Sequence, residues 1–185
     1  ESWRGDWVIW LDEPYRYVFI MQEKRFFLFF GEAGTCEDER FSCIPVSALR
    51  APSSKDVCFA LMTAWHLYCW YRDNRFCGRC SHPTAHDAKE RMMRCPSCGN
   101  MIFPRISPAV IVAITDGDRL LMSKYAGRGF TRYALIAGYT EIGETLEQTV
   151  QREVMEEVGL KVKNIRYYKS QPWGIDGNIL MGFYC

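Results

Sequence analysis

The sequence lacks the features of a membrane-spanning protein. No run of about 18 apolar residues is present in the 185 residues, which excludes a transmembrane helix, and no signal peptide is visible at the start. The net charge is only +1, so the chain as a whole makes no electrostatic case for binding nucleic acid or a membrane. Internal repeats and low-complexity stretches are also missing. Because 48% of the residues are hydrophobic, we expect a globular protein with a buried core.

The net charge is small, but the positive and negative residues are unevenly distributed along the chain. Residues 72–105 hold seven Lys or Arg and three Asp or Glu, which leaves about +4 there and about −3 elsewhere. A stretch of this kind is often a solvated face, and it can also bind phosphates. Both interpretations stay open at this point.

Cysteine, in contrast, is abundant and patterned. Four of the nine Cys form the pairs Cys77-Gly-Arg-Cys80 and Cys95-Pro-Ser-Cys98, which are 14 residues apart. Each pair can turn two thiolates onto one ion, and four thiolates leave no position for water, so the spacing predicts a structural Zn²⁺ site. A redox dithiol is the competing interpretation. Paired cysteines of this kind are typical of a reducing compartment, and we expect a cytoplasmic protein.

The segments around these cysteines have different patterns. Three aromatic and β-branched runs, at 7–10, 17–21 and 26–30, predict an antiparallel meander. A helix is expected from about Lys55 to Arg72. Its apolar stripe comprises Val57, Leu61, Ala64, Trp65, Tyr68 and Tyr71.

The remainder of the chain alternates strands with one helix. Residues 110–114 and 120–122 predict a hairpin around the turn at 116–118, and further strands are expected at about 133–137, 162–169 and 179–184. Residues 145–158 lack Gly and Pro and predict a helix that ends at Gly159.

This last helix carries a cluster of carboxylates. At roughly 100° per residue, Glu153 lies about 40° from Glu157, and Glu156 lies about 60° to the other side. Clustered like charges destabilise a helix unless they have partners. Hard oxygen ligands on one face suit Mg²⁺ or Mn²⁺. A solvated acidic face paired with nearby Lys or Arg is the alternative.

The surrounding residues match a known pattern. A Gly, five residues, a Glu, seven residues and then Arg-Glu-aliphatic-x-Glu-Glu-x-Gly-aliphatic are found at Gly138, Glu144 and residues 152–160. This arrangement resembles the Nudix box, which implies metal-dependent hydrolysis of a nucleoside diphosphate linkage. By the same resemblance Glu153, Glu156 and Glu157 hold the metal, one of them serving as a base, and Arg152 orients Glu144.

Three further segments narrow the resemblance. They are the four-Cys ribbon directly before the box, the linker Phe103-Pro-Arg-Ile-Ser-Pro108, and Ser170-Gln-Pro-Trp173 after it. Together they resemble the NADH pyrophosphatase family, whose members are also RNA NAD-cap hydrolases. This implies cleavage of NAD(H) to nicotinamide mononucleotide and AMP by a homodimer. It also implies nicotinamide contacts from Tyr139, from Phe103 across the dimer interface, and from Gln171 and Trp173. Ordinary packing is the alternative for each aromatic ring.

Two departures keep other functions open. Gly174-Ile175-Asp176 replaces the family's Pro-Phe-Pro, and the later strand, helix and carboxylate of a Nudix domain are not found before Cys185. The alternatives are a Nudix hydrolase of another nucleoside diphosphate derivative, such as ADP-ribose or a diadenosine polyphosphate, and a zinc-ribbon RNA-binding module without catalysis.

The expected fold class is α+β, namely a Nudix α/β/α sandwich with a mixed sheet, preceded by a zinc ribbon and a β-rich N-terminal domain. The expected domains are residues 1–73, which end in a helix, a ribbon at 74–104, and a C-terminally incomplete Nudix domain at 105–185.

Overall fold

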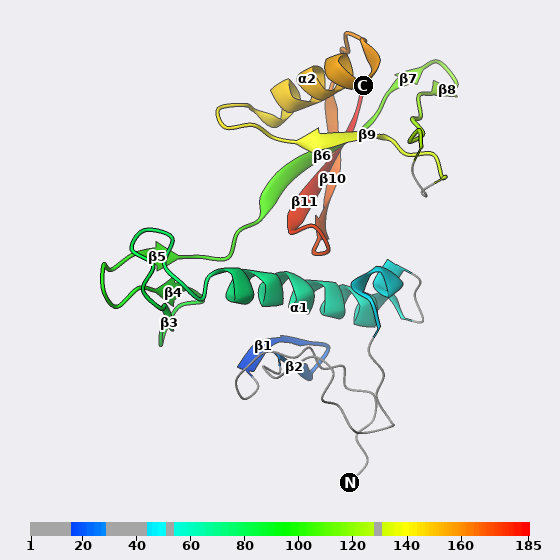
Figure 1. Ribbon diagram of the computed structural model, residues 1–185. Coiled ribbons are helices and arrows are strands. Elements are labelled where there is room, and N and C mark those ends of the chain that lie inside the picture. Colours follow the sequence, from blue (N-terminus) through cyan, green and yellow to red (C-terminus); the bar gives the residue numbers. More distant parts are fainter. Residues whose placement is uncertain (1–15, 29–43, 51–53, 128–130) are drawn as a thin grey trace. The chain divides into compact units, whose positions relative to one another are not determined.

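The computed structural model describes residues 16–28, 44–50, 54–127 and 131–185. The chain divides into two compact units, Glu1–Arg105 with Gly174–Asp176, and Ile106–Trp173 with Gly177–Cys185. Figure 1 shows the elements of each unit. None of the helices in the described ranges has the length and apolar character needed to cross a membrane.

The first unit begins with a β-hairpin. Strand β1 (Arg16–Met21) pairs antiparallel with β2 (Lys24–Leu28), and the turn residues Gln22 and Glu23 both have positive φ. The predicted strands over 17–21 and 26–28 are therefore confirmed. Residues 7–10, 29 and 30 of the predicted meander lie outside the described ranges.

A short 3₁₀ helix, η1 (Val46–Arg50), precedes the long helix α1 (Lys55–Asp73), which confirms the predicted helix. The predicted stripe is only partly right, because Leu61, Ala64 and Tyr71 are buried but Val57, Trp65 and Tyr68 are half-buried. Apolar residues surround α1 almost completely, so periodicity alone could not select the buried face. The residues buried on α1 are Ala60, Leu61, Ala64, Leu67, Trp70 and Tyr71.

The ribbon belongs to the same unit. It is a three-stranded antiparallel sheet of β3 (Ala85–His86), β4 (Met93–Arg94) and β5 (Met101–Ile102). Met93 is only 6% exposed and packs in one core cluster with residues of β1, β2 and α1. The Arg91 guanidinium also donates to the carbonyl oxygen of Val18 in β1. The ribbon and the N-terminal elements therefore share a core, and the predicted three-domain boundaries remain a proposal.

The second unit is built on a four-stranded sheet with the order β10-β11-β6-β9. The strands are β6 (Ser107–Ala113), β9 (Ile136–Tyr139), β10 (Arg166–Trp173) and β11 (Asn178–Tyr184). The β11–β6 pair is parallel and the other two pairs are antiparallel, so the mixed sheet is confirmed.

Helix α2 (Leu146–Val158) packs on one face of this sheet, against β6 and β9 (Figure 1). The fully buried side chains at this contact are Val110, Val112, Ile136, Val150 and Val154. Apolar residues on the sheet and at every third or fourth position of α2 thus fix the orientation of the helix.

The strand predictions differ from the structure in position and pairing. The predicted hairpin of residues 110–114 and 120–122 is confirmed only near its turn, where the Leu121 N–H donates to the Ile114 carbonyl at 2.9 Å, because β6 pairs with β9 and β11 instead. Only the small hairpin of β7 (Thr115–Asp116) and β8 (Arg119–Leu120) forms around Gly117, which has a φ of 58°. β9 and β10 begin three and four residues later than predicted.

Candidate functional site

The ends of α2 are fixed by local hydrogen bonds. The Thr145 side chain accepts from the Gln148 backbone N–H, and the Gln148 side chain accepts from the Thr145 backbone N–H, which forms a capping box. Gly159 ends the helix in the left-handed conformation with a φ of 68°, as predicted. Since Val150 and Val154 face the sheet, the start of α2 and its carboxylates are held in a defined position relative to β9.

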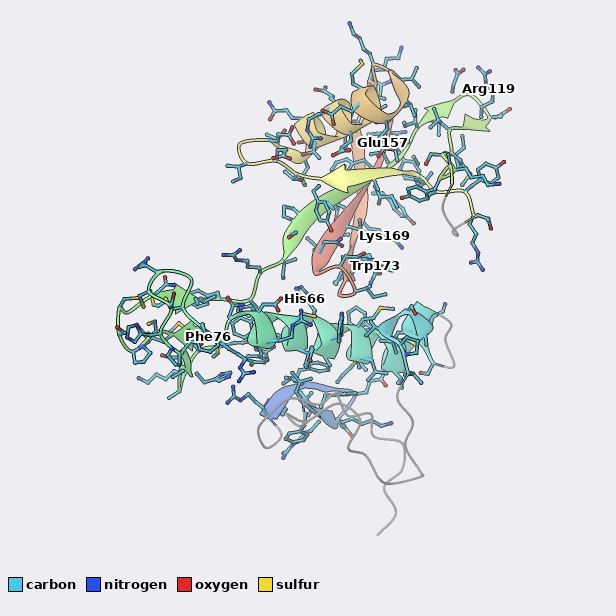
Figure 2. All side chains as sticks on the ribbon, viewed as in Figure 1. His66, Phe76, Arg119, Glu157, Lys169 and Trp173 are labelled. Carbon is cyan, nitrogen blue, oxygen red and sulfur yellow. The ribbon has the colours of Figure 1, made fainter. Side chains whose placement is uncertain are left out.

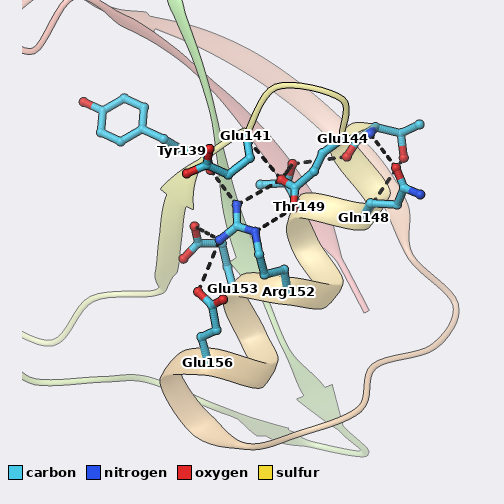
Figure 3. Close-up of polar contacts among 9 residues, drawn as sticks. Tyr139, Glu141, Glu144, Gln148, Thr149, Arg152, Glu153 and Glu156 are labelled. Atoms are coloured by element: carbon cyan, nitrogen blue, oxygen red, sulfur yellow. Dashed lines mark hydrogen bonds and ion pairs between the residues drawn. The ribbon is translucent and has the colours of Figure 1, made fainter.

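Arg152 is the centre of the carboxylate cluster (Figure 3). Its Nε and Nη2 donate to the two oxygens of Glu144, at 2.6 and 3.0 Å. Its Nη1 donates to Glu153 at 2.7 Å and to Glu156 at 3.3 Å, and its Nη2 also donates to the backbone oxygen of Tyr139 at 2.8 Å. The predicted ion pair with Glu144 is therefore present, and one guanidinium ties three carboxylates to the end of β9.

Glu144 is the most firmly held of these acids. Besides Arg152, the backbone N–H of Glu141 and the Thr149 hydroxyl donate to its Oε2, each at 3.0 Å. The Arg152 guanidinium, with these two further donors, lowers the pKa of the Glu144 carboxyl from 4.5 to about 2. Glu144 is therefore an anion at neutral pH, and its carboxylate holds the Arg152 guanidinium in place.

Glu153 lies directly over Gly138 of β9. A Cβ built on Gly138 would fall 2.0 Å from Cδ of Glu153 and 2.1 and 2.2 Å from its oxygens. The glycine is needed here for space, because its φ is not among the positive values. This contact explains why the pattern that ends at residue 160 begins with a glycine, Gly138, because a larger residue would displace Glu153.

The charge of the cluster fits a divalent cation. Glu144, Glu153, Glu156 and Glu157 carry four negative charges against the one positive charge of Arg152. Burial, with the neighbouring Glu153 charge, raises the pKa of the Glu157 carboxyl. Oxygen ligands of this number and hardness suit Mg²⁺ or Mn²⁺.

The carboxylates of the three expected ligands, Glu153, Glu156 and Glu157, do not converge on a single point, however. Among the described residues, only the four cysteines bring at least three ligand atoms within 4.8 Å of one another. Glu153 and Glu156 are instead turned toward Arg152. An ion that keeps waters and binds substrate phosphates does not require an all-protein cage. The donor set fits Mg²⁺ or Mn²⁺ on this basis.

The zinc site has the predicted arrangement. The sulfur atoms of Cys77 and Cys98 lie 3.6 Å apart and those of Cys80 and Cys95 lie 3.4 Å apart. The backbone N–H of Arg79 donates to the Cys77 sulfur at 3.4 Å and lowers the pKa of that thiol, whereas the neighbouring thiols raise the pKa of Cys80, so that within the cluster Cys77 loses its proton first. A lowered pKa favours the thiolate that zinc requires.

The residues expected around a nicotinamide are less closely assembled. Tyr139 is 50% exposed and its ring points away from the Arg152 cluster (Figure 3). Figure 2 shows Trp173 at the turn between β10 and β11, and Glu157 on α2. The Gln171 side chain is exposed and donates to the Pro172 carbonyl at 3.3 Å. Phe103 belongs to the first unit and is 51% exposed.

Sequence reasoning missed three contributors to the site. The Glu141 backbone and Thr149 hold Glu144, and Asn178 donates from its amide to the Tyr139 hydroxyl at 3.2 Å. The Thr-x-x-Gln pattern at 145–148 predicts a capping box, and it would have located the start of the helix. No local pattern marks Asn178, because its partner Tyr139 lies 39 residues away in the sequence, whereas Thr149 lies only five residues from Glu144 and was overlooked.

Comparison with known protein families identifies the family of the domain that contains this cluster. The NUDIX domain family matches residues 105–181, which contain the whole Arg152 cluster. Residues 105–181 are a Nudix domain. The family described as the NADH pyrophosphatase zinc ribbon domain matches residues 72–103. The Nudix domain is thus preceded directly by a zinc ribbon of this type.

Several curated relatives are similar to this chain in sequence. The NAD-capped RNA hydrolase NudC of Pectobacterium atrosepticum is 42% identical over 114 residues, which are 62% of this chain and 44% of the relative. The protein of the same name from Citrobacter koseri is 43% identical over the same shares. The chain therefore matches less than half the length of these relatives.

Among solved structures, a NUDIX hydrolase from Nitrosomonas europaea covers 60% of this chain and 65% of its own, with 20% identity and a TM-score of 0.47.

Proposed function

We propose that this protein hydrolyses the diphosphate linkage of NAD(H) to nicotinamide mononucleotide and AMP, and that it removes NAD caps from RNA 5′ ends. The observation that carries the proposal is the joining of two features in one chain. A Nudix domain with its carboxylate cluster supplies the reaction type, and the preceding ribbon of the NADH pyrophosphatase type indicates the substrate. The relatives named as NAD-capped RNA hydrolases support the capped RNA as a second substrate.

We assign the following roles to the residues of the site. Glu153, Glu156 and Glu157 would hold Mg²⁺ or Mn²⁺. The ion would neutralise part of the negative charge of the diphosphate and would activate a water molecule for attack on phosphorus. Water adds to one phosphorus, the bridging P–O bond breaks, and each product keeps one phosphate. One of these three carboxylates takes the proton of the water. Arg152, braced by Glu144, keeps the carboxylates aligned with the end of β9.

The nicotinamide would stack on Tyr139, with Gln171 and Trp173 completing its pocket and Phe103 contributed by the partner subunit of a homodimer. Stacking on one aromatic face is worth about 1 kcal/mol. We place the protein in the cytoplasm because its cysteines form a metal site of the kind found in reducing compartments.

RNA phosphates would bind to the basic ribbon. Arg91 and Arg94 are engaged within the protein, since Arg91 donates to Val18 and Arg94 pairs with Asp87 at 3.2 Å. Arg79 and Lys89 are exposed and point to the ribbon surface as the RNA contact. Binding through such contacts weakens as salt increases.

The decisive test compares substrates at equal concentration. Purified protein with Mg²⁺ or Mn²⁺ should turn over NADH with a kcat/KM at least tenfold above that for ADP-ribose, and Glu157→Gln should remove both activities. Faster cleavage of ADP-ribose would replace the proposed substrate while keeping the chemistry. Undiminished activity of Glu157→Gln would contradict the proposed site.

Binding of RNA without catalysis is tested separately. If the chain is only a zinc-ribbon RNA-binding module, Glu156→Gln and Glu157→Gln will leave RNA affinity unchanged, removal of zinc will abolish it, and no NADH or capped RNA will be cleaved. The proposal predicts instead that cap removal requires both carboxylates.

A further inference from the structure

The strand register places one group of side chains on the sheet face that lies opposite α2. Gly138 faces α2 through its contact with Glu153, so its neighbour Tyr139 points to the other face. Tyr139 pairs with Ala109, and Ala109 also pairs with Leu180, which lies two residues beyond Asn178 on β11. Tyr139 and Asn178 therefore share this face, which we call the second face.

Two residues of the expected pocket lie there as well. Trp173 is directly opposite Asn178 in the β10–β11 pair, and Gln171 is directly opposite Leu180. Because opposite residues in a pair point to the same side, both belong to the second face. Asn178 lies on β11, between β10 and β6. It therefore shares the second face with the residues that would line the pocket, and Trp173 of β10 is directly opposite it.

Asn178 reaches Tyr139 across β6. On this face Ala109 of β6 lies between β9 and β11, and its side chain is small enough to let the Tyr139 ring extend over β6. The Asn178 amide donates to the Tyr139 hydroxyl at 3.2 Å. Exchanging the oxygen and nitrogen of the amide keeps this contact, with the hydroxyl then donating. Tyr139 is held at both ends, because its backbone oxygen accepts from Arg152 at 2.8 Å.

The burial of Asn178 is costly for folding. The residue is only 6% exposed, and its Oδ1 has no hydrogen-bond partner among the residues that the structure describes. A buried polar atom without a partner lowers stability, and an apolar side chain of the same size avoids that penalty. An amide at this position is explained by its contact with Tyr139 better than by the stability of the sheet.

We propose that Asn178 is a positioning residue that fixes the ring of Tyr139 for stacking with a flat base, and so helps to determine specificity for the nicotinamide end of the substrate. The inference rests on the proposed function for the identity of that base. The half-exposed Tyr139 ring would otherwise rotate and lose part of its stacking on binding. Because its backbone is tied to Arg152, a fixed ring also fixes the base relative to the carboxylates.

Binding measurements separate this role from a general structural one. Asn178→Leu and Tyr139→Phe should each weaken binding of nicotinamide mononucleotide about three- to tenfold, which is the range of one net hydrogen bond. AMP affinity should not change. The double variant should bind no more than twofold weaker than either single variant, because both remove the same contact. Tyr167→Phe, at an exposed tyrosine of β10, is the matched control.

A second measurement does not depend on the substrate. Fluorotyrosine placed at position 139 should report a fixed ring by NMR in the parent protein and a mobile ring in Asn178→Leu. The thermal midpoint of Asn178→Leu should be equal to that of the parent or higher. A ring that stays fixed in Asn178→Leu, or variants that weaken AMP and nicotinamide mononucleotide equally, would overturn the inference. A released ring in a protein that does not bind the mononucleotide would leave Asn178 as the positioning residue and overturn the proposed substrate.

Discussion

Replacing Gly138 by Ala adds one methyl group directly against the carboxylate of Glu153. The new Cβ would lie 2.0 Å from Cδ of Glu153, whereas ordinary van der Waals contact begins at 3.4 Å, so the carboxylate must retreat by about 1.4 Å. The backbone of Gly138 accepts alanine, because its φ is not among the positive values. The strand should therefore form, and the displacement should fall on the Glu153 side chain.

The consequence is loss of alignment with little loss of fold. Glu153 would leave its 2.7 Å contact with Arg152 and its place beside Glu156. A displacement of about 1 Å in a catalytic group can reduce the rate about 100-fold. We therefore predict that Gly138→Ala lowers kcat for NADH about 100-fold, while the thermal midpoint changes by no more than a few degrees.

Steady-state kinetics with Mg²⁺ and a thermal melt of the same preparation check this prediction. Gly78→Ala is the control, since its added methyl meets no atom within 4 Å and its φ is not positive. Full activity in Gly138→Ala would refute the reasoning, because it would mean that the position of Glu153 over β9 does not matter for catalysis.

Three further predictions concern charge and zinc. Arg152→Lys should reduce kcat at least about tenfold, because a lysine cannot reproduce the forked contacts to Glu144 and Glu153, and kinetics equal to the parent would contradict this role. The Glu144 ion pair should stabilise the fold fully above pH 4.5 and progressively less as the pH falls toward 2. The difference in unfolding free energy between the parent and Glu144→Gln, measured by denaturant titration, should therefore shrink from pH 6 to pH 3. Removing zinc with a chelator should free Met93 from the core around α1 and shift the fluorescence of Trp70 to the red. An unchanged emission spectrum would mean that the packing of this core does not depend on the zinc site.

The sequence was most informative where a local pattern determines the structure. Helix α2 was predicted from its lack of Gly and Pro and from Gly159, and these features act within a few residues of one another. The four cysteines were equally clear, because the spacing within each pair is enough to bring two sulfurs to one ion. The ion pair between Glu144 and Arg152 followed from the resemblance to the Nudix box.

Features that depend on distant pairing were less predictable. Whether β6 turns back onto residues 120–122 or pairs with β11 depends on segments about 70 residues away, and the structure has the parallel β11–β6 pair. The buried face of α1 was uncertain because apolar residues lie all around it. The role of Asn178 required the register of three strands, and no pattern in the sequence supplies that register.

We propose above all that the Arg152-centred carboxylate cluster hydrolyses NADH in the presence of a divalent metal. The most direct measurement is incubation of the purified protein with NADH and Mg²⁺ or Mn²⁺, with chromatographic separation of the products. We expect equal amounts of reduced nicotinamide mononucleotide and AMP, and neither product with a chelator or with Glu157→Gln. Cleavage that persists in Glu157→Gln, or products other than these two mononucleotides, would contradict it.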